Sequence, residues 1–480
     1  MSKILKETEH ELSILKEIAA LLDWDSKVAM PRLGATHRGE QNAYIALKIH
    51  EIMTNSRLDK EITQLQKKKL KDLDNKIVNK YAKQIIRLKN IPHQHVEEYT
   101  NLQTVAYDKW IEAREKNDYH ILEPHLKKIF AMKRKEATYI DPKKNPYDVL
   151  LEKFHEGMTV EKIDKIFAEL KPKLIALLRK TSPVAYTIKG DFSNEKQFAL
   201  CSEISATILQ ERDRFGIGKT VHPFMTTIGP DDFRITTSIR DDPFFSLMST
   251  VHETGHALYE MNFKKRLRGT ILFDAASFSL HESQSRFWEN HIARSNAFWD
   301  WKYPAFKKVF NIRNTQNEFV KKLNEIKNSP IRIETGELAY GLHIIIRYEL
   351  EKALIEGSLS VEKLPEVWNA KYQEYLGINP KTMKEGVLQD MHWVMDGIGY
   401  FPTYLLGSIY AAMIYKTMNK SFAVEKDLAK GDFTRIRTWL KEHIHQYGAS
   451  KTTEEIVQDA CGKPIDINSY IAHLKKTYGV

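Results

Sequence analysis

The chain has 480 residues, enough for one large helical domain or for two or three ordinary ones. Its 21 glycines and 16 prolines are fewer than average, which disfavours a β-sandwich or propeller and indicates long helices. Hydrophobic residues make up 42% and charged residues 28%, the balance of a folded globular protein rather than a disordered one. Lysine and arginine (73) exceed aspartate and glutamate (63), but both signs alternate along the chain, so no nucleic-acid partner is expected.

Cysteine usage and hydropathy bear on the compartment. Cys201 and Cys461 cannot form a disulfide framework, and no zinc-finger spacing occurs. The N-terminal segment mixes charged residues into every apolar stretch, unlike a signal peptide. The most apolar segment, Tyr400 to Tyr415, is too short to cross a bilayer and contains Pro402. We therefore expect a soluble cytoplasmic protein with no membrane partner.

Apolar residues recur at helical spacing along most of the chain. Glycine, proline and β-branched residues gather between Gly216 and Ile239 and predict a small β element over about 219–240. A second extended stretch is expected around Pro330 to Ile333. The fold is predicted to be mainly α, one domain over 1–480 or two lobes around a cleft. Amphipathic helices are predicted over 3–24, 37–55, 58–90, 94–137, 160–180 and 194–214, and from about 244 to the end.

An HExxH motif stands at His252-Glu253-Thr254-Gly255-His256. Residues four apart lie on the same face of a helix, so both imidazoles can bind one Zn²⁺. Glu253 lies beside them and can take a proton from an attacking water, the general-base role in metal-assisted peptide hydrolysis. Apolar residues on both sides of the motif favour a buried helix.

A catalytic zinc needs a third protein ligand and an open fourth position. Glu282 follows at a suitable distance, in His281-Glu282-Ser283-Gln284, and is the predicted third ligand. Glu289 is the reserve candidate. Asp274 is a candidate hydrogen-bond partner for a ligating histidine, and His281 is expected to support the site without binding the metal.

Five ordered motifs resemble those of the thermostable carboxypeptidase family (M32) of metallocarboxypeptidases. The family elements HPF, DxRxT, HExxH, HESQ and GxxQDxHW match the segments that begin at His222, Asp232, His252, His281 and Gly386. Further matches extend the resemblance from about residue 21 to 410.

One family motif, IRxxAD, departs from the pattern. It appears here as Ile331 to Gly336, with Thr335-Gly336 in place of Ala-Asp, and Met225 replaces the threonine of HPFT. The departure concerns the wall that faces the substrate. The metal ligands are unchanged.

The resemblance implies a large helical gluzincin-type peptidase with a deep groove and a small β-sheet near the active site. It also implies a homodimer that acts on peptide substrates as a zinc carboxypeptidase. Specificity is expected to be broad, with poor cleavage before a C-terminal proline. One Zn²⁺ is expected per chain, and Co²⁺ or Mn²⁺ could replace it.

Reading a free C-terminal carboxylate calls for an arginine, whose planar fork matches that group. Arg332 is the first candidate and Arg234 the second, because both lie in matched motifs. Arg347 stands in a helical run and is predicted instead to form a structural ion pair with a neighbour such as Glu349 or Glu351.

The carbonyl oxygen of the scissile bond gains negative charge and needs donors beyond the metal. His392 and either Tyr400 or Tyr404 resemble the donors of related helical peptidases; we assign Tyr404 to catalysis and Tyr400 to substrate binding. His222 is expected to line the groove, with a buried structural role as its alternative. His343, in an apolar helical run, is predicted to be a core histidine.

Three functions are compatible with these features. The leading one is a zinc carboxypeptidase with His252, His256 and Glu282 as ligands and Glu253 as base. A metallo-oligopeptidase that cuts internally is the alternative and needs no carboxylate-reading arginine. A basic helical binding protein with a metal site but no turnover is the third, and the intact Glu253 and dispersed charge disfavour it.

Overall fold

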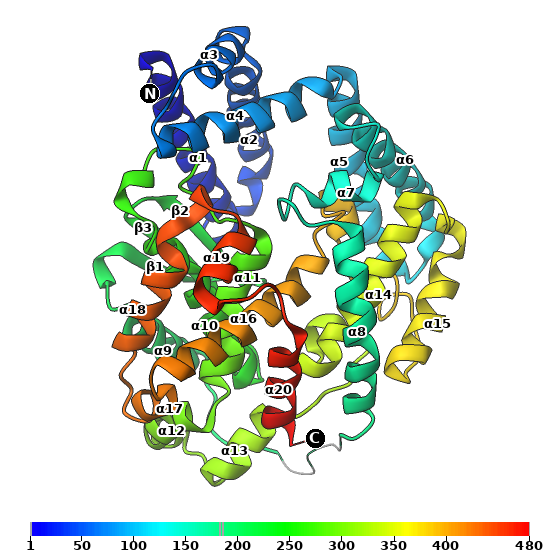
Figure 1. The fold of residues 1–480 in the computed structure, drawn as a ribbon. Coiled ribbons are helices and arrows are strands. Elements are labelled where there is room, and N and C mark those ends of the chain that lie inside the picture. The colour runs from blue at the N-terminus through cyan, green and yellow to red at the C-terminus, as the bar shows by residue number, and fades with distance from the viewer. Residues whose placement is uncertain (1, 182–183, 185–186, 480) are drawn as a thin grey trace. The chain divides into compact units, whose positions relative to one another are not determined.

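Helices dominate the structure, a computed structural model that describes residues 2–181, 184 and 187–479 (Figure 1). Contacts between Cα atoms divide the chain into two compact units. Unit 1 comprises Met1–Lys89, Thr187–Leu323 and Tyr410–Ile465; unit 2 comprises Asn90–Tyr186, Asn324–Ile409 and Asp466–Val480. Within the described part of the chain, none of the helices is both apolar and long enough to span a membrane.

Unit 1 contains the three strands and most of the helices. Its strands are β1 (Phe215–Lys219), β2 (Met225–Gly229) and β3 (Asp232–Thr237). Its helices are α1 (Lys3–Val28), α2 (Ala35–Thr54), α3 (Ser56–Gln66), α4 (Asp72–Asn90), α9 (Asn194–Leu209), α10 (Pro243–Met261), α11 (Phe278–Arg286), α12 (Asn296–Phe310), α13 (Gln316–Leu323), α17 (Val424–Leu428), α18 (Thr434–His443) and α19 (Thr453–Cys461).

Among the described residues of unit 2, the regular elements are all helices. The long helix α16 (Pro402–Ser421) begins in unit 2 and continues into unit 1. The other helices of unit 2 are α5 (His93–Lys116), α6 (Glu123–Ile140), α7 (Pro146–Leu151), α8 (Val160–Leu178), α14 (Glu337–Glu356), α15 (Leu364–Leu376) and α20 (Ile467–Tyr478).

The sheet has the order β1-β3-β2, with β3 parallel to β1 and antiparallel to β2. Ile235 pairs with Ile217 on one side and with Met225 on the other, and its side chain is fully buried. The β-branched residues of β3 fit a strand with neighbours on both edges. The β element predicted over 219–240 is therefore confirmed.

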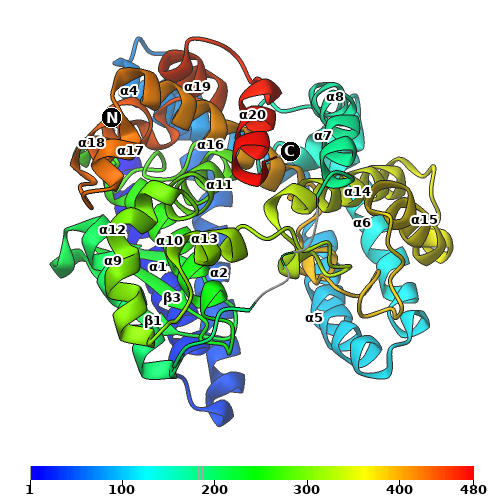
Figure 2. The same cartoon turned by 90° about the horizontal axis from the view of Figure 1, so that it is seen from below.

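Helix α10 lies between α9 and α11 and packs against the sheet (Figures 1 and 2). The Asp242 carboxylate accepts a hydrogen bond from the Phe244 N–H, and Pro243 occupies the first turn, where its missing N–H costs nothing. Most of its side chains are buried, in agreement with the apolar sequence around HExxH.

Gly255 allows α10 and α11 to approach closely. A Cβ atom at this position would lie 2.6 Å from the Gln284 carbonyl oxygen and 2.8 Å from the Ser285 Cα. Both atoms belong to the backbone of α11, which cannot move aside as a flexible side chain would. Glycine at the fourth position of the HExxH motif thus sets the distance between the two helices.

The N-terminal helices pack on the segment that leads to α11. Leu5, Leu12 and Tyr81 are buried in one cluster with Leu267 and Leu272. This cluster fixes one face of α1 against residues 267–272.

Two predicted helices are each broken in two. The helix over 58–90 is α3 and α4, and the helix over 94–137 is α5 and α6. At the second break Asn117 adopts a left-handed conformation, φ 54°, which ends α5. These short breaks, residues 67–71 and 117–122, leave the hydrophobic periodicity of the flanking helices intact, so periodicity alone does not reveal them.

The prediction of an extended stretch around Pro330 to Ile333 is wrong. Residues Arg332–Glu334 form a 3₁₀ turn. The Arg332 N–H donates to the Gln389 side chain at 2.8 Å rather than to a neighbouring strand. The β-branched residues that suggested a strand lack a partner strand here.

Replacement of Gly255 by alanine tests the contact between α10 and α11. We expect Gly255→Ala to lower the free energy of unfolding by about 1–3 kcal/mol, because the added methyl group meets backbone atoms. Gly39→Ala is the matched control: apart from the adjacent backbone of α2 itself, nothing lies within 4 Å of a Cβ there, so alanine should stabilise α2 by about 0.5–1 kcal/mol. Urea denaturation measures both, and equal effects would contradict the account of Gly255.

Candidate metal centre

Three side chains from α10 and α11 converge on one point. His252, His256 and Glu282 each offer a ligand atom, and these atoms lie within 4.8 Å of one another. The Glu282 Oε2 atom is 3.6 Å from the Nε2 of His252 and 3.5 Å from the Nε2 of His256. Among the residues that the structure describes, no other group of histidine, cysteine and acidic side chains meets this criterion.

These distances fit a metal ion. Ligands about 2.0–2.2 Å from a tetrahedral zinc are about 3.3–3.6 Å from one another, which agrees with the two distances from Glu282 to the histidines. Two imidazoles and one carboxylate are also the donor set of catalytic zinc sites that keep a fourth position for water. The three residues therefore fit a divalent metal of the zinc type.

Glu289 orients His252 instead of joining the ligand group. Its Oε2 atom lies 2.9 Å from the Nδ1 of His252, on the side of the ring away from the ligand atom. Arg286 bridges the two carboxylates, with Nε 2.7 Å from Glu282 and Nη1 3.2 Å from Glu289. Burial alone would raise the pKa of Glu289, but Arg286 and His252 outweigh it and lower the pKa to about 2. A charged carboxylate behind a histidine fixes its tautomer and its orientation.

His256 is supported by stacking. Its ring lies on that of His281, with centroids 4.2 Å apart and an interplanar angle of 18°. The Nε2 of His281 is 2.8 Å from a Glu260 oxygen, and the Thr227 hydroxyl donates to the other oxygen of Glu260. His281 thus contacts a predicted ligand without being in the ligand group.

The predicted partnership between Asp274 and a ligating histidine is wrong. The Asp274 carboxylate accepts a hydrogen bond from the neighbouring Ala275 N–H at 2.7 Å. Glu289, not Asp274, contacts a ligating histidine. Glu289 lies on a π-helical turn, Phe287–Ala293, that continues α11. The wider π turn shifts residues around the axis, so helical spacing alone could not identify this partner.

Glu253 is buried at the centre of the site, with 7% of its surface exposed. Burial raises its pKa to about 7, against the opposing effect of His252. A carboxylate whose pKa lies near neutrality can accept a proton and release it again.

In unit 2, Arg332 forms a buried ion pair with Asp390. Its Nη2 is 2.8 Å and its Nε 3.2 Å from the two carboxylate oxygens, and Nη1 donates to the Tyr340 hydroxyl at 3.1 Å. The pair is held in place by Gln389, which accepts from the Arg332 backbone N–H.

His392 and two tyrosines gather near this ion pair, also in unit 2. The Nε2 of His392 is 3.4 Å from the Tyr404 hydroxyl, its Nδ1 is 3.8 Å from Asp390, and its ring stacks on Tyr400. Burial lowers the pKa of His392 to about 3, so the imidazole is neutral at pH 7. The structure thus brings together Arg332, His392, Tyr400 and Tyr404.

The sheet of unit 1 carries the remaining two candidates. The Arg234 guanidinium pairs with both oxygens of Asp232, at 2.9 and 2.7 Å, and lies over the ring of Trp24. His222 is exposed in the segment between β1 and β2. The alternative prediction for it, a buried structural role, is therefore wrong.

Arg347 does not form the ion pair predicted for it. Its guanidinium lies over Trp393, with Cζ 3.4 Å from the ring centroid. Glu351 accepts hydrogen bonds from Tyr147 and the Trp393 indole instead. His343 is 2% exposed, with Nδ1 2.9 Å from the Tyr372 hydroxyl, which confirms a core histidine.

An HExxH helix with a glutamate on the following helix is the arrangement of the gluzincin class of metallopeptidases. Comparison with known proteins agrees. A model of the Carboxypeptidase Taq (M32) metallopeptidase family matches residues 4–478. Carboxypeptidase 1 of Bacillus subtilis is 38% identical over 97% of this chain and 96% of its own length. Thermostable carboxypeptidase 1 of Thermus thermophilus is 33% identical over 99% of this chain and 97% of its own length.

Solved structures give the same result for the fold. The crystal structure of an M32 carboxypeptidase from Deinococcus radiodurans superposes with a TM-score of 0.96, at 31% identity over 100% of this chain and 99% of that one. The chain therefore belongs to the Carboxypeptidase Taq (M32) metallopeptidase family. It is an enzyme, a metallocarboxypeptidase, and the helical fold expected from the resemblance is confirmed.

Substitution of Glu289 tests its support of His252. We expect Glu289→Gln to weaken metal binding about 10- to 100-fold, because a neutral amide holds the imidazole less firmly than a carboxylate. Competition with a chromophoric chelator measures the affinity. Asp274→Asn is the matched control and should leave it unchanged, since Asp274 bonds no candidate ligand. Equal affinities for Glu289→Gln and the unaltered protein would contradict this role.

Proposed function

We propose that the protein is a zinc-dependent carboxypeptidase that releases C-terminal amino acids from peptides. The observation that carries this proposal is the convergence of His252, His256 and Glu282 around one point beside the buried Glu253. Membership in a metallopeptidase family implies a divalent metal, and the donor set favours zinc, with Co²⁺ or Mn²⁺ as possible replacements.

A metal bound by these three residues would polarise the scissile carbonyl and lower the pKa of the attacking water. Glu253 would accept the proton of that water on its carboxylate. It would then deliver the same proton to the nitrogen of the departing residue. Burial favours both steps, because it raises the pKa of Glu253 towards neutrality.

Arg332 is proposed to bind the free carboxylate of the substrate. Asp390 occupies Nε and one side of Nη2, and Tyr340 receives one N–H of Nη1. Nη1 and Nη2 each carry a second N–H, which these contacts leave over. Such a pair of donors matches the two oxygens of a carboxylate.

His392 and Tyr404 are proposed to donate to the carbonyl oxygen as it gains negative charge. A neutral imidazole keeps one N–H for this purpose, and the low pKa of His392 supports that state. Tyr400, stacked on His392, is proposed to contact the substrate and to hold the ring in place.

The outer edge of β2 is proposed to bind the main chain of the peptide. The Thr236 N–H donates to the Phe224 carbonyl, so Phe224 and Thr226 direct their backbone groups to β3. By alternation, those of Met225 and Thr227 point to the open edge, where an extended peptide can pair with them. His222 and Arg234 lie at this sheet and are proposed as further substrate contacts.

Three finer properties follow from the family resemblance alone. We propose broad specificity, poor action before a C-terminal proline, and a homodimer. A cytoplasmic location is proposed because both cysteines, Cys201 and Cys461, are free thiols, as expected in a reducing compartment. Light scattering in solution tests the dimer directly.

The role of Glu253 is tested by Glu253→Gln. This substitution keeps the shape of the side chain but removes the proton acceptor, so we expect kcat to fall about 10²–10⁴-fold. Metal content should stay at one ion per chain, which metal analysis of the same sample measures. Full activity in the metal-loaded variant would contradict the proposed mechanism.

The role of Arg332 is tested by Arg332→Lys, which keeps the charge opposite Asp390 but lacks the fork. We expect kcat/KM for peptides with a free C-terminus to fall about 10- to 100-fold, because one ammonium cannot bind both oxygens. Arg234→Lys, measured in the same assay, tests the second candidate for binding the carboxylate. A metallo-oligopeptidase would instead cleave amidated peptides as fast as free ones and be indifferent to Arg332→Lys.

A further inference from the structure

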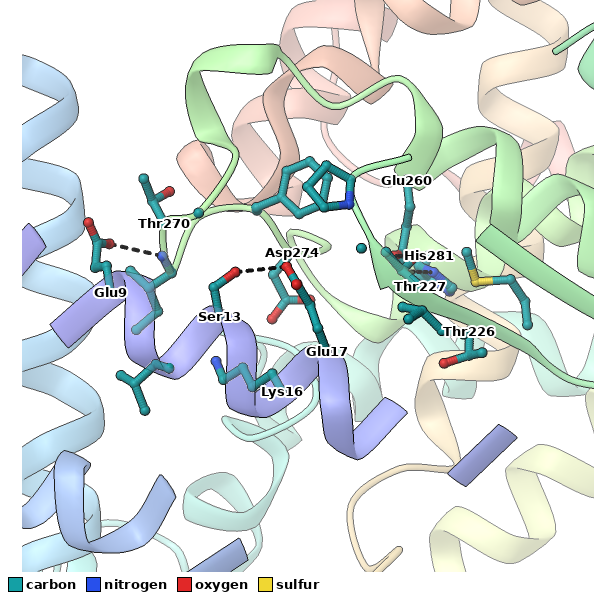
Figure 3. A pocket seen from close by; sticks show the side chains of 18 of the residues that line it. Glu9, Ser13, Lys16, Glu17, Thr226, Thr227, Glu260, Thr270, Asp274 and His281 are labelled. Carbon is teal, nitrogen blue, oxygen red and sulfur yellow. Dashed lines mark hydrogen bonds and ion pairs between the residues drawn. The ribbon is translucent and has the colours of Figure 1, made fainter. Parts of the chain in front are cut away.

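A cavity of about 360 Å³ lies in unit 1, between α1, β2 and residues 269–274. Figure 3 shows Glu9, Ser13, Lys16 and Glu17 of α1 on one side of it and Thr227 on another. A volume of this size accommodates a large side chain or a short piece of peptide. The hydrophobic cluster that fixes α1 against residues 267–272 holds these walls together.

The cavity adjoins the candidate metal centre. His281 and Glu260 both line it, and the ring of His281 stacks on that of His256, a predicted ligand. A group in the cavity therefore lies one side chain away from a ligand of the metal. This makes the cavity a neighbour of the site where the scissile bond is proposed to bind.

The open edge of β2 leads into the same cavity. Met225 and Thr227, whose backbone groups face that edge, are among its lining residues, and so is Gly229 at the end of the strand. A peptide that paired with this edge would direct part of its length into the cavity.

The cavity carries an excess of negative charge. Four carboxylates line it, and Lys16 is the one lysine or arginine among its lining residues. The Glu260 carboxylate contacts the Nε2 of His281, and the Glu9 carboxylate accepts a hydrogen bond from the Ile271 N–H at 3.1 Å. Glu17 accepts from the Ser13 hydroxyl at 3.0 Å.

Glu17 and Asp274 are the two carboxylates best suited to a ligand. Asp274 accepts from the adjacent Ala275 N–H, and neither residue forms an ion pair among the salt bridges of the described residues. In Figure 3 both side chains extend into the space between α1 and the segment that precedes α11. Asp274 is exposed and Glu17 half-buried, so a cation beside them would be attracted by two carboxylates that solvent also reaches.

The direction of the peptide follows from the reaction. An enzyme that releases single C-terminal residues has one residue on the departing side of the scissile bond. An extended run of backbone that pairs with β2 must therefore lie on the other side, towards the N-terminus of the substrate.

We propose that this cavity is a subsite for a cationic group of the peptide on the N-terminal side of the scissile bond, recognised by Glu17 and Asp274. The group is a lysine or arginine side chain, or the free amino group of a short peptide. This inference rests on the proposed carboxypeptidase function and adds a substrate preference to it.

The test compares acetylated peptides that carry lysine or norleucine, scanned over the three positions that precede the scissile bond. At one position we expect kcat/KM to be about three- to tenfold higher for lysine, with the preference declining at high salt. A second arm compares acetylated with free short peptides and distinguishes a side chain from an amino group as the source of the charge.

Variants tie the preference to the cavity. Glu17→Gln and Asp274→Asn should each move the ratio of lysine to norleucine towards one. Glu11→Gln is the matched control, because Glu11 is an exposed residue of α1 that does not line the cavity, and it should leave the ratio as it is. Thermal melts verify that each variant is folded.

The test distinguishes failure of the subsite from failure of the proposed function. If norleucine peptides are cleaved but a positive charge makes no difference at any position or at the amino terminus, the subsite is overturned and the carboxypeptidase function stands. A preference that persists in both cavity variants also overturns it. If the metal-loaded protein cleaves none of the peptides, the proposed function fails and the subsite with it.

Discussion

The site depends on the close approach of α10 to α11. Gly255 offers no side chain where the backbone of Gln284 and Ser285 lies, so Glu282 comes within reach of both imidazoles. Any larger residue would separate the helices and widen the ligand triangle. A position inside the motif that carries no chemistry of its own therefore controls the geometry of the residues that do. The apolar sequence of α10, packed between α9, α11 and the sheet, holds this arrangement rigid.

Burying carboxylates at this contact creates a charge that must be balanced. Glu282 is buried and Glu289 half-buried, and Arg286 bonds to both. Arg294, 3.7 Å from Glu289, is a second cation, so two arginines face the two glutamates. The divalent cation that the ligand geometry fits would therefore lie beside carboxylates that arginines already orient. The same logic operates around Arg332, where Asp390 keeps a buried guanidinium charged and oriented. Buried ion pairs here serve to position groups rather than to stabilise the fold.

The sequence predicts the centre of the site better than its surroundings. The HExxH motif predicts the metal-ligand group. Hydrophobic periodicity predicts the helical class, and β-branched runs predict the β element over 219–240. The sequence offers Glu289 only as a reserve ligand, because its bond to His252 depends on a π turn that no spacing rule reveals. The strand expected at Pro330 to Ile333 fails because β-branched residues form strands only beside a partner strand. The stacking of Arg347 on Trp393 joins two elements distant in the chain, and local pairing rules miss it.

The central claim is that a metal held by His252, His256 and Glu282 enables removal of C-terminal residues. Mass spectrometry of an acetylated peptide incubated with the native protein, with the chelated protein and with the protein restored by Zn²⁺ tests it directly. We expect stepwise loss of residues from the C-terminus, abolished by the chelator and recovered with Zn²⁺. Internal cleavage, or C-terminal cleavage that the chelator leaves unchanged, would contradict it.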